Sequence, residues 1–225
     1  MVSMTKNSPH SRTMGNKHDY LPAAGHDAFL PVYDLFTRLL GVRGIHRTLV
    51  DQAELAPGAE VLEIGCGTGN LTLLSADAAP GASLVGTDPD PRALARAERK
   101  RKHRENVRFD RAYSQELPFP DASFDRVLSA FMWHHLDSDV KRATAAELHR
   151  VLRPGARLHL VDVAGHPTPT DGRVARRMHR NPHLAENLGD AIPNLLSDNG
   201  FDCAETSSRA FRRFGRITWY RATRR

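Results

Sequence analysis

The segment at residues 61–70, which reads VLEIGCGTGN, constrains the fold of this chain more than any other. Its apolar first half, with Glu60 before it, is typical of a buried strand, and residues 71–79 favour a helix directly after it. Between them stand three alternating glycines, Gly65, Gly67 and Gly69. Glycines allow unusual backbone angles and let a ligand approach main-chain N–H groups at the start of a helix. The order of strand, glycine turn and helix indicates a ligand site at the carboxyl end of a strand.

The rest of the chain alternates between strand and helix patterns. Further strands are expected at residues 83–87, 107–109, 124–131 and 157–163, and further helices at residues 29–40, 45–55, 91–102, 138–151 and 184–199. This alternation predicts an α/β fold with an open, mostly parallel sheet and helices on both faces. The β-like runs at residues 201–210 and 216–222 are too close for a helical crossover. They should therefore form an antiparallel hairpin at the edge of the sheet.

Length and composition favour one folded domain. The chain has 225 residues, of which 40% are hydrophobic and 26% charged, and no low-complexity linker divides it. Residues 1–18 are polar and are expected to be a flexible tail, which leaves residues 19–225 for the domain. No apolar stretch approaches the roughly 20 residues needed to cross a bilayer. Cys66 and Cys203 are too few for a disulfide framework or a metal site, which favours the cytoplasm.

The net charge of +6 raises the question of an anionic partner. Basic residues concentrate at residues 92–104 and again at residues 209–225. The first cluster alternates with Ala and Glu, as on the solvated face of a helix. The second cluster could bind RNA or an anionic small molecule, so such a partner stays an alternative.

An acidic residue follows the glycine turn at a distance that suggests a ligand. Asp88 closes the expected second strand, about twenty residues after the glycines, where a carboxylate can bind the two hydroxyls of a ribose. The two features together indicate a ligand that contains a nucleoside. A nicotinamide dinucleotide fits less well, because its fingerprint places the third glycine where this chain has Asn70. A tight turn without any ligand is the structural alternative.

Several stretches resemble, in register, the class I S-adenosylmethionine-dependent methyltransferases. The segment at 61–70 is similar to the first motif of that family, and VGTDPD at 85–90 is similar to its second-strand end. The likeness continues in ELPFPDASFD at 116–125, FMWHHL at 131–136, RVLRPGARL at 150–158 and GRITWYRA at 215–222. The resemblance runs from about residue 40 to the end and is greatest to the small-molecule branch of ubiquinone and menaquinone biosynthesis. It implies a Rossmann-like fold and the cofactor S-adenosyl-L-methionine.

The resemblance also implies a set of cofactor contacts. Asp88 would hold the ribose and Pro89 would touch the adenine. The methionine moiety would lie against the residues in and around the glycine turn, with Phe131 nearby: Glu63, Gly65, Cys66, Gly67 and Gly69. The family often carries an acidic residue that reaches the adenine amino group, but this chain has Tyr113 there. Either Tyr113 or its neighbours Ser114 and Gln115 would then make that contact.

Transfer of a sulfonium methyl group requires mainly that the acceptor be held in line and that water be kept out. If the acceptor is a hydroxyl or a phenol, a histidine could accept its proton near neutral pH. His134 and His135 follow the fourth strand at the same edge as the glycines and are the candidates, although a structural hydrogen bond would also explain each. Residues 19–56 could form a helical lid over the acceptor, as in similar enzymes, with contacts from Tyr20, His26, Phe29 and Tyr33.

The main prediction for the acceptor is a small molecule, methylated on O, C or N. The Asn-Pro-Pro-Tyr-like string that base-amino methyltransferases carry after the fourth strand is absent, which disfavours DNA. Methylation of RNA or another anionic acceptor is one alternative. A module that binds the cofactor without catalysis is another. Neither a metal nor a membrane span is expected.

Overall fold

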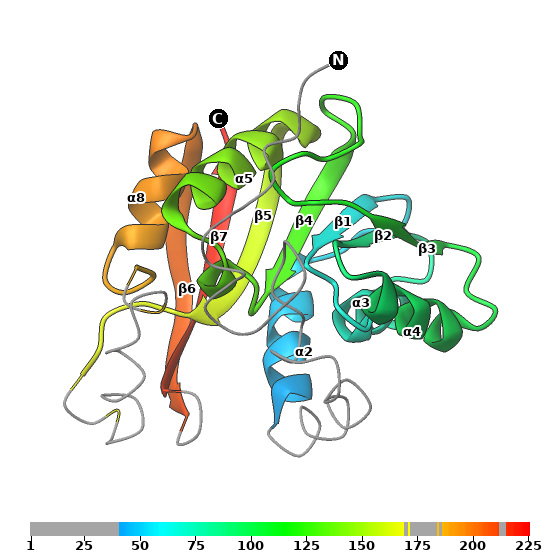
Figure 1. The fold of residues 1–225 in the computed structure, drawn as a ribbon, viewed down its shortest axis with the longest axis horizontal. Coiled ribbons are helices and arrows are strands. Elements are labelled where there is room, and N and C mark those ends of the chain that lie inside the picture. Colours follow the sequence, from blue (N-terminus) through cyan, green and yellow to red (C-terminus); the bar gives the residue numbers. More distant parts are fainter. Residues whose placement is uncertain (1–40, 169–170, 172–183, 185, 212–214) are drawn as a thin grey trace.

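The computed structural model describes residues 41–168, 171, 184, 186–211 and 215–225. The expected tail at residues 1–18 and the expected helix at residues 29–40 lie outside this part of the chain. Within it, seven strands form one sheet in the order β3-β2-β1-β4-β5-β7-β6 (Figure 1). The strands are β1 Glu60–Ile64, β2 Ser83–Asp88, β3 Val107–Arg111, β4 Phe124–Ala130, β5 Leu152–Val163, β6 Phe201–Phe211 and β7 Gly215–Arg224.

The sheet has the predicted mixture of strand directions. β3, β2, β1, β4 and β5 pair in parallel, while β7 pairs antiparallel with both β5 and β6. The predicted C-terminal hairpin is confirmed, because the short segment between β6 and β7 leaves no room for a crossover helix. Tyr220 of β7 stands opposite Leu160 of β5 on one side and Glu205 of β6 on the other. β7 is therefore an inner strand, and β6 forms the edge.

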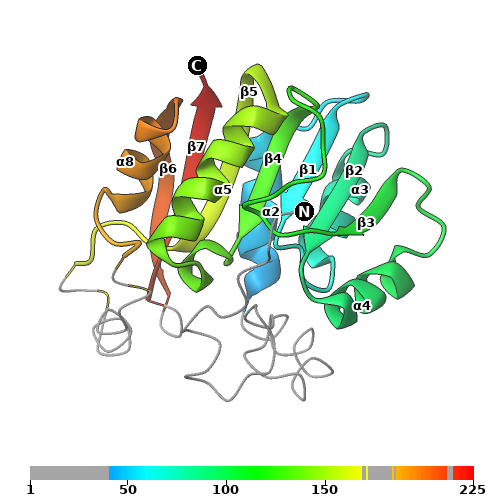
Figure 2. The same ribbon diagram turned by 45° about the horizontal axis from the view of Figure 1, so that its top comes forward.

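Helices cover both faces of the sheet (Figures 1 and 2). They are α2 Val42–Ala53, α3 Asn70–Ala78, α4 Pro91–Arg101, α5 Ser138–Val151 and α8 Ala191–Asp198, with the 3-10 helix η2 Trp133–His135. α2 and α3 bury Leu49 and Leu71 against one face, whereas α5 and α8 bury Leu148 and Leu196 against the other. The predicted layers of a Rossmann-like fold are thus confirmed. None of the described helices has the length and apolar character that a membrane crossing requires.

Two elements begin five or more residues away from where the sequence predicts. β5 begins at Leu152, directly after α5, and pairs with β4 in an irregular register before residue 157. The helix expected at residues 184–199 is shorter, since α8 begins only at Ala191. Leu188 pairs with Gly165 instead of continuing a helix, and Gly189 has a φ of +63°. A residue in the left-handed region ends regular helical geometry, which explains the late start of α8.

The carboxyl ends of the parallel strands meet at one edge of the sheet. From β1 the chain passes to β2 and β3, and it then returns to β4 on the other side of β1. The order of the strands therefore reverses between β1 and β4. A crevice outside the strand ends at such a switch point is where open α/β sheets bind ligands.

Candidate active site

The glycine turn after β1 depends on backbone angles that favour glycine. Gly65, Gly67 and Gly69 have φ angles of +66°, +52° and +78°. At Gly69 a Cβ atom would lie 2.7 Å from Cζ of Phe109, a residue of β3. At Gly65 a Cβ atom would collide with the side chain of Met132, which follows β4. The turn therefore fits tightly against β3 on one side and against the end of β4 on the other.

Asp88 connects the end of β2 to this turn. Its Oδ2 accepts the N–H of Gly67 at 2.8 Å, and its Oδ1 accepts the N–H of Asp90 at 2.9 Å. Asp88 is 8% exposed, and this burial raises its pKa to about 6. A carboxylate offers about four lone-pair positions, so two N–H bonds leave capacity for two further donors. The carboxylate can accept the vicinal hydroxyls of a ribose without losing its contact to the turn.

Glu63 of β1 is a buried carboxyl close to the same turn. It accepts a hydrogen bond from the hydroxyl of Thr72 in α3. Burial raises the pKa of Glu63 to about 8, against the lowering effect of the bond from Thr72. No positively charged side chain among the described residues forms an ion pair with it. A ligand that brings an ammonium group would supply the missing counter-charge.

Phe131 holds an unusual backbone conformation at the end of β4. Its φ is +56°, a left-handed value that bulky residues rarely adopt. Its N–H donates to the carbonyl of Val161 at 2.9 Å, and its ring centroid lies 6.4 Å from that of His46 in α2. Desolvation lowers the pKa of His46 to about 4, so this imidazole is neutral. Strain of this kind persists only where the surrounding structure enforces it, and it gathers at functional sites.

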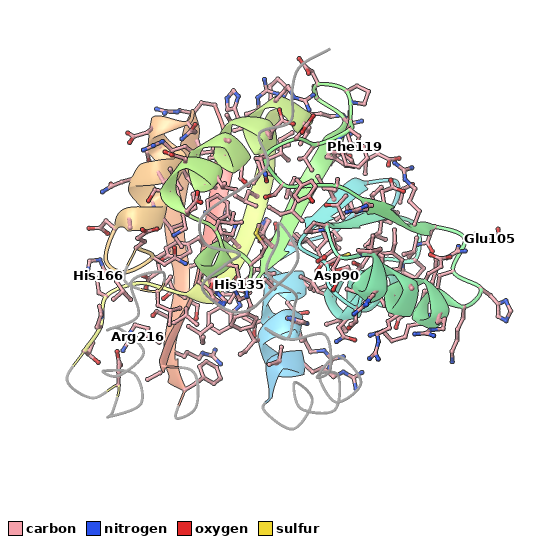
Figure 3. The ribbon with its side chains drawn as sticks, viewed as in Figure 1. Asp90, Glu105, Phe119, His135, His166 and Arg216 are labelled. Atoms are coloured by element: carbon pink, nitrogen blue, oxygen red, sulfur yellow. The ribbon has the colours of Figure 1, made fainter. Side chains whose placement is uncertain are left out.

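The 3-10 helix η2 places His134 and His135 in different surroundings. Nδ1 of His134 lies 2.5 Å from Oδ1 of Asp162, a fully buried residue of β5. The backbone N–H of His134 donates to Oδ2 of the same carboxylate at 3.3 Å. His135 is exposed, with its ring centroid 4.0 Å from that of His134, near the ends of β4 and β5 (Figure 3). The structure therefore distinguishes two histidines that the sequence leaves equivalent.

The chain after β3 carries three half-buried candidates for the adenine contact, Tyr113, Ser114 and Gln115. Ser114 Oγ lies 2.9 Å from Oγ1 of Thr144 in α5. The carbonyl of Pro89, the other adenine candidate, accepts Nε of Arg111 in β3 at 3.0 Å. Both sides of the predicted adenine contact are thus anchored to neighbouring elements of the fold.

Two further residues at this edge of the sheet bind candidate site residues, and the sequence did not identify them. Asp162 binds His134, and Thr72 binds Glu63. Asp162 lies near the end of an apolar parallel strand, as Asp88 does. Ligand-binding groups gather at such strand ends, so its position could have indicated Asp162 as a site residue. Thr72 gives no such signal, because a threonine near the start of a helix commonly serves local backbone contacts.

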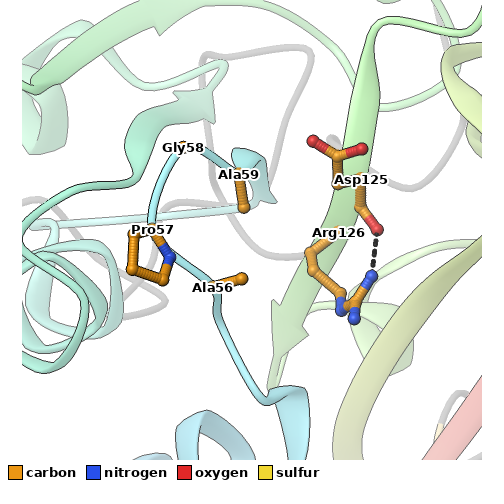
Figure 4. A pocket seen from close by; sticks show the side chains of 6 residues that line it. All are labelled: Ala56, Pro57, Gly58, Ala59, Asp125 and Arg126. Carbon is orange, nitrogen blue, oxygen red and sulfur yellow. Dashed lines mark hydrogen bonds between the residues drawn. The ribbon is translucent and has the colours of Figure 1, made fainter.

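A separate hollow lies at the opposite edge of the sheet (Figure 4). It is lined by Asp125 and Arg126 of β4 and by the turn before β1, Ala56, Pro57, Gly58 and Ala59. Arg126 donates to the carbonyl of Asp125 at 2.8 Å and to that of Ala53 at 3.0 Å. β1 and β4 begin at this edge, whereas the glycine turn follows the end of β1. The hollow is therefore not part of the candidate active site.

Comparison with known proteins identifies the class of this chain. A family profile described as a methyltransferase domain matches residues 61–155. The demethylmenaquinone methyltransferase of Thermus thermophilus is 42% identical over 151 residues, which cover 65% of this chain and 67% of that protein. The O-methyltransferase cnsE of Penicillium expansum is 35% identical over 176 residues, 76% of this chain and 58% of that protein. A Haloferax volcanii methyltransferase, solved in complex with the Trm112 methyltransferase activator, shares the fold with a TM-score of 0.69 at 17% identity, over 88% of this chain and 96% of that one.

The chain therefore belongs to the class I S-adenosylmethionine-dependent methyltransferases. Within this class it resembles the ubiquinone and menaquinone biosynthesis methyltransferases, and its cofactor is S-adenosyl-L-methionine. It spans 67%, 58% and 45% of the lengths of three demethylmenaquinone methyltransferases that it matches. The described residues contain no group of three His, Cys, Asp or Glu side chains that could hold a metal ion.

Proposed function

We propose that this enzyme methylates a small-molecule acceptor at the switch point between β1 and β4. The bond from Gly67 to Asp88 carries the proposal, because it joins the glycine turn and the ribose-binding acid into one site. η2 follows β4, the strand next to β1, so its histidines border that site. The names of two relatives support a small molecule, one being a demethylmenaquinone methyltransferase and the other an O-methyltransferase.

Each part of the site has a role that its position supports. When bound, the cofactor supplies a methyl group that a sulfonium centre makes electrophilic. Asp88 accepts the ribose hydroxyls, while Pro89 and residues 113–115 meet the adenine. The glycine turn, with Cys66 in it, receives the methionine moiety, and Glu63 faces its ammonium group. Phe131 closes the site on the side of α2.

Replacing Asp88 by alanine should weaken the binding of S-adenosylmethionine by about 100-fold. The variant loses two hydrogen bonds from ribose hydroxyls to a charged acceptor, each worth about 1.5 kcal/mol. Isothermal titration calorimetry measures the affinity, and NAD should give no binding in the same experiment. Asp110→Ala is the matched control, because it removes an acid of β3 whose ion pair among the described residues is with Arg108, at 3.1 Å. Equal affinity in the Asp88 variant, or a preference for NAD, contradicts the proposed site.

Cofactor binding near neutral pH should release about one proton from Glu63. The folded apoprotein keeps this carboxyl protonated at pH 7, since its pKa is raised to about 8. An ammonium group beside it favours the charged form and lowers the pKa, so the proton leaves on binding. Calorimetry in buffers of different ionisation enthalpy measures the number of protons released. The Glu63→Gln variant should bind with no such release, and a wild-type titration without proton release removes Glu63 from the ammonium contact.

The cysteines support a cytoplasmic location. Cys66 is buried and Cys203 is half-buried, and both are free thiols. Burial raises the pKa of both thiols, that of Cys203 to about 12. Free and unreactive cysteines suit a reducing compartment. Fractionation of cells that produce the protein should recover it with cytoplasmic markers.

A further inference from the structure

The contact between His134 and Asp162 has the geometry of a base held by a carboxylate. We infer that Asp162 is a positioning residue that makes His134 the general base of methyl transfer, and that the acceptor is therefore a hydroxyl on an aromatic or enolic carbon. This inference rests on the proposed function. It extends that function by choosing one histidine and by naming the chemical class of the acceptor.

The carboxylate of Asp162 fixes the proton on the ring of His134. Three groups converge on it: Nδ1 of His134 at 2.5 Å, the N–H of His134 at 3.3 Å and the N–H of Val163 at 2.7 Å. An ionised carboxylate can only accept hydrogen bonds, so Nδ1 carries the ring proton. Nε2 then presents a lone pair, which is the form of imidazole that acts as a base. A base oriented in turn by a third group is the arrangement expected of acid–base catalysis.

The burial of Asp162 separates this pair from an ordinary surface contact. Asp162 is fully buried and the His134 side chain is 19% exposed. The chain holds a second pair of the same type, His166 and Asp190, whose Nε2 and Oδ1 are 3.0 Å apart and whose side chains are 66% and 65% exposed. His166 lies on the loop after β5 (Figure 3). Electrostatic interactions are far stronger in a protein interior than in water, so only the buried pair holds an imidazole rigidly.

The base lies beside the cofactor turn. Met132, two residues before His134, packs its side chain against Gly65. β1 and β4 are neighbours in the sheet, with Ile64 opposite Ser129 shortly before the two strands end. η2 is therefore adjacent to the place where the glycine turn receives the methionine moiety. An acceptor between the two would meet the methyl group on one side and the imidazole on the other.

Among the acceptors considered, a weakly acidic hydroxyl is the one whose methylation such a base accelerates most. General bases work best when the proton to be removed is neither already lost nor very tightly held, which describes phenols and enols near neutral pH. A protonated amine would bring a positive charge next to the sulfonium, which is repulsive. An aliphatic alcohol holds its proton too strongly for an imidazole to remove it in the ground state.

Proton and electron pairs balance in this step. The acceptor gives an electron pair to the methyl carbon, and the bond from that carbon to sulfur breaks with its electron pair kept by sulfur. The hydroxyl proton passes to Nε2 of His134, and Asp162 stabilises the imidazolium that results. Because His134 is partly exposed, water can then take the proton away.

The first test is spectroscopic and needs no turnover. In the wild-type protein labelled with ¹⁵N-histidine, the ring nitrogens of His134 should report the tautomer with its proton on Nδ1. Asp162→Asn should shift the population toward the other tautomer. Asp190→Asn, the matched change in the exposed pair, should leave the His134 signals unchanged. A wild-type His134 with its proton on Nε2 overturns the inference.

The second test compares acceptors of two different acidities: 4-methoxyphenol and 4-methoxy-1-naphthol on one side, and 4-nitrophenol and 4-nitro-1-naphthol on the other. At about pH 8 the nitro compounds are largely ionised and need no base, whereas the methoxy compounds do. Asp162→Asn should lower kcat by about 100-fold for the methoxy compounds and by less than about 5-fold for the nitro compounds, with KM little changed. His134→Gln should give the same pattern, which keeps the test valid if Asp162→Asn fails to fold. Asp190→Asn should retain wild-type kcat.

The outcomes separate this inference from the proposed function. Equal losses for both kinds of acceptor overturn the role of His134 as a base. Binding of S-adenosylmethionine without product from any of these hydroxyaromatic compounds contradicts the acceptor class. Failure of the wild-type protein to bind S-adenosylmethionine contradicts the proposed function itself, and calorimetry reports that independently of any acceptor.

Discussion

Gly69→Ala should lower the free energy of unfolding by about 3 kcal/mol, whereas Gly58→Ala should lower it by only about 1 kcal/mol. Both glycines have a φ of +78°, so an alanine side chain is equally strained by the backbone at the two positions. Only at Gly69 would the new Cβ meet other atoms, at 2.7 Å from Cζ of Phe109 and 2.9 Å from Cβ of Ala97. At Gly58 it would meet nothing within 4 Å. The difference in the free energy of unfolding between the two variants therefore measures how tightly the glycine turn packs against β3 and α4.

Urea unfolding followed by circular dichroism measures both values. The clash at Gly69 is with an aromatic ring, so Phe109→Leu should relieve part of it. The double variant should then be more stable than the sum of the single changes predicts, because residues in contact are coupled. If Gly69→Ala costs no more than Gly58→Ala, the turn has room for a side chain and the tight fit is wrong.

His159→Leu should stabilise the protein, and the gain should increase as the pH falls. His159 of β5 is fully buried, and neither ring nitrogen has a hydrogen-bond partner among the described residues. Burial lowers its pKa to about 3, and the positive charges of Arg126, Arg157 and Arg221 add to this effect. The unfolded chain takes up a proton at His159 below about pH 6.5, whereas the folded chain does so only near pH 3. Proton uptake at His159 therefore leaves the free energy of unfolding unchanged above pH 6.5. Between pH 6.5 and pH 3 it lowers this free energy by about 1.4 kcal/mol for each unit by which the pH falls.

Urea titrations at about pH 7.5 and about pH 5 test this prediction. At the higher pH the variant should gain about 1 kcal/mol, because it no longer buries an unsatisfied polar group. At the lower pH the gain should reach about 3 kcal/mol, since leucine takes up no proton in the unfolded chain. The raised pKa values of Glu63 and Asp88 give the opposite slope, so the difference between variant and wild type is the quantity to compare. A gain from His159→Leu that is the same at both pH values contradicts the burial argument.

Local sequence signals were sufficient to predict most of the fold. Alternating apolar strands and amphipathic helices predicted the parallel part of the sheet, and the short spacing between residues 210 and 216 predicted the hairpin. The start of α8 was predicted wrongly, because the apolar residues before it are compatible with a helix. Leu188 pairs with Gly165, a residue far away in the sequence, and this pairing prevents the helix from starting before Ala191. A contact of this kind leaves no periodic signal.

Prediction of the candidate site from the sequence has the same limit, because part of it depends on contacts between distant residues. Gly65, Gly67, Gly69 and Asp88 follow strand ends and could be named from spacing alone. His134 and His135 could not be separated, because they are adjacent and chemically identical. In a 3-10 helix each residue turns by about 120° from the one before it, so only one of two neighbours can face a given strand. Which one does so depends on the position of Asp162 in β5, and the structure assigns the contact to His134.

The position of β7 in the sheet also limits the order in which the chain can assemble during synthesis. Among the described strands, β6 hydrogen-bonds only with β7, and β7 separates it from β5. As the chain leaves the ribosome, β1 to β5 can pair with one another and form the glycine turn. β6 has no strand to join until residues 215–224 have also emerged. The cofactor half of the enzyme can therefore form first, and β6 can join the sheet only after the strand that follows it in the sequence has been made.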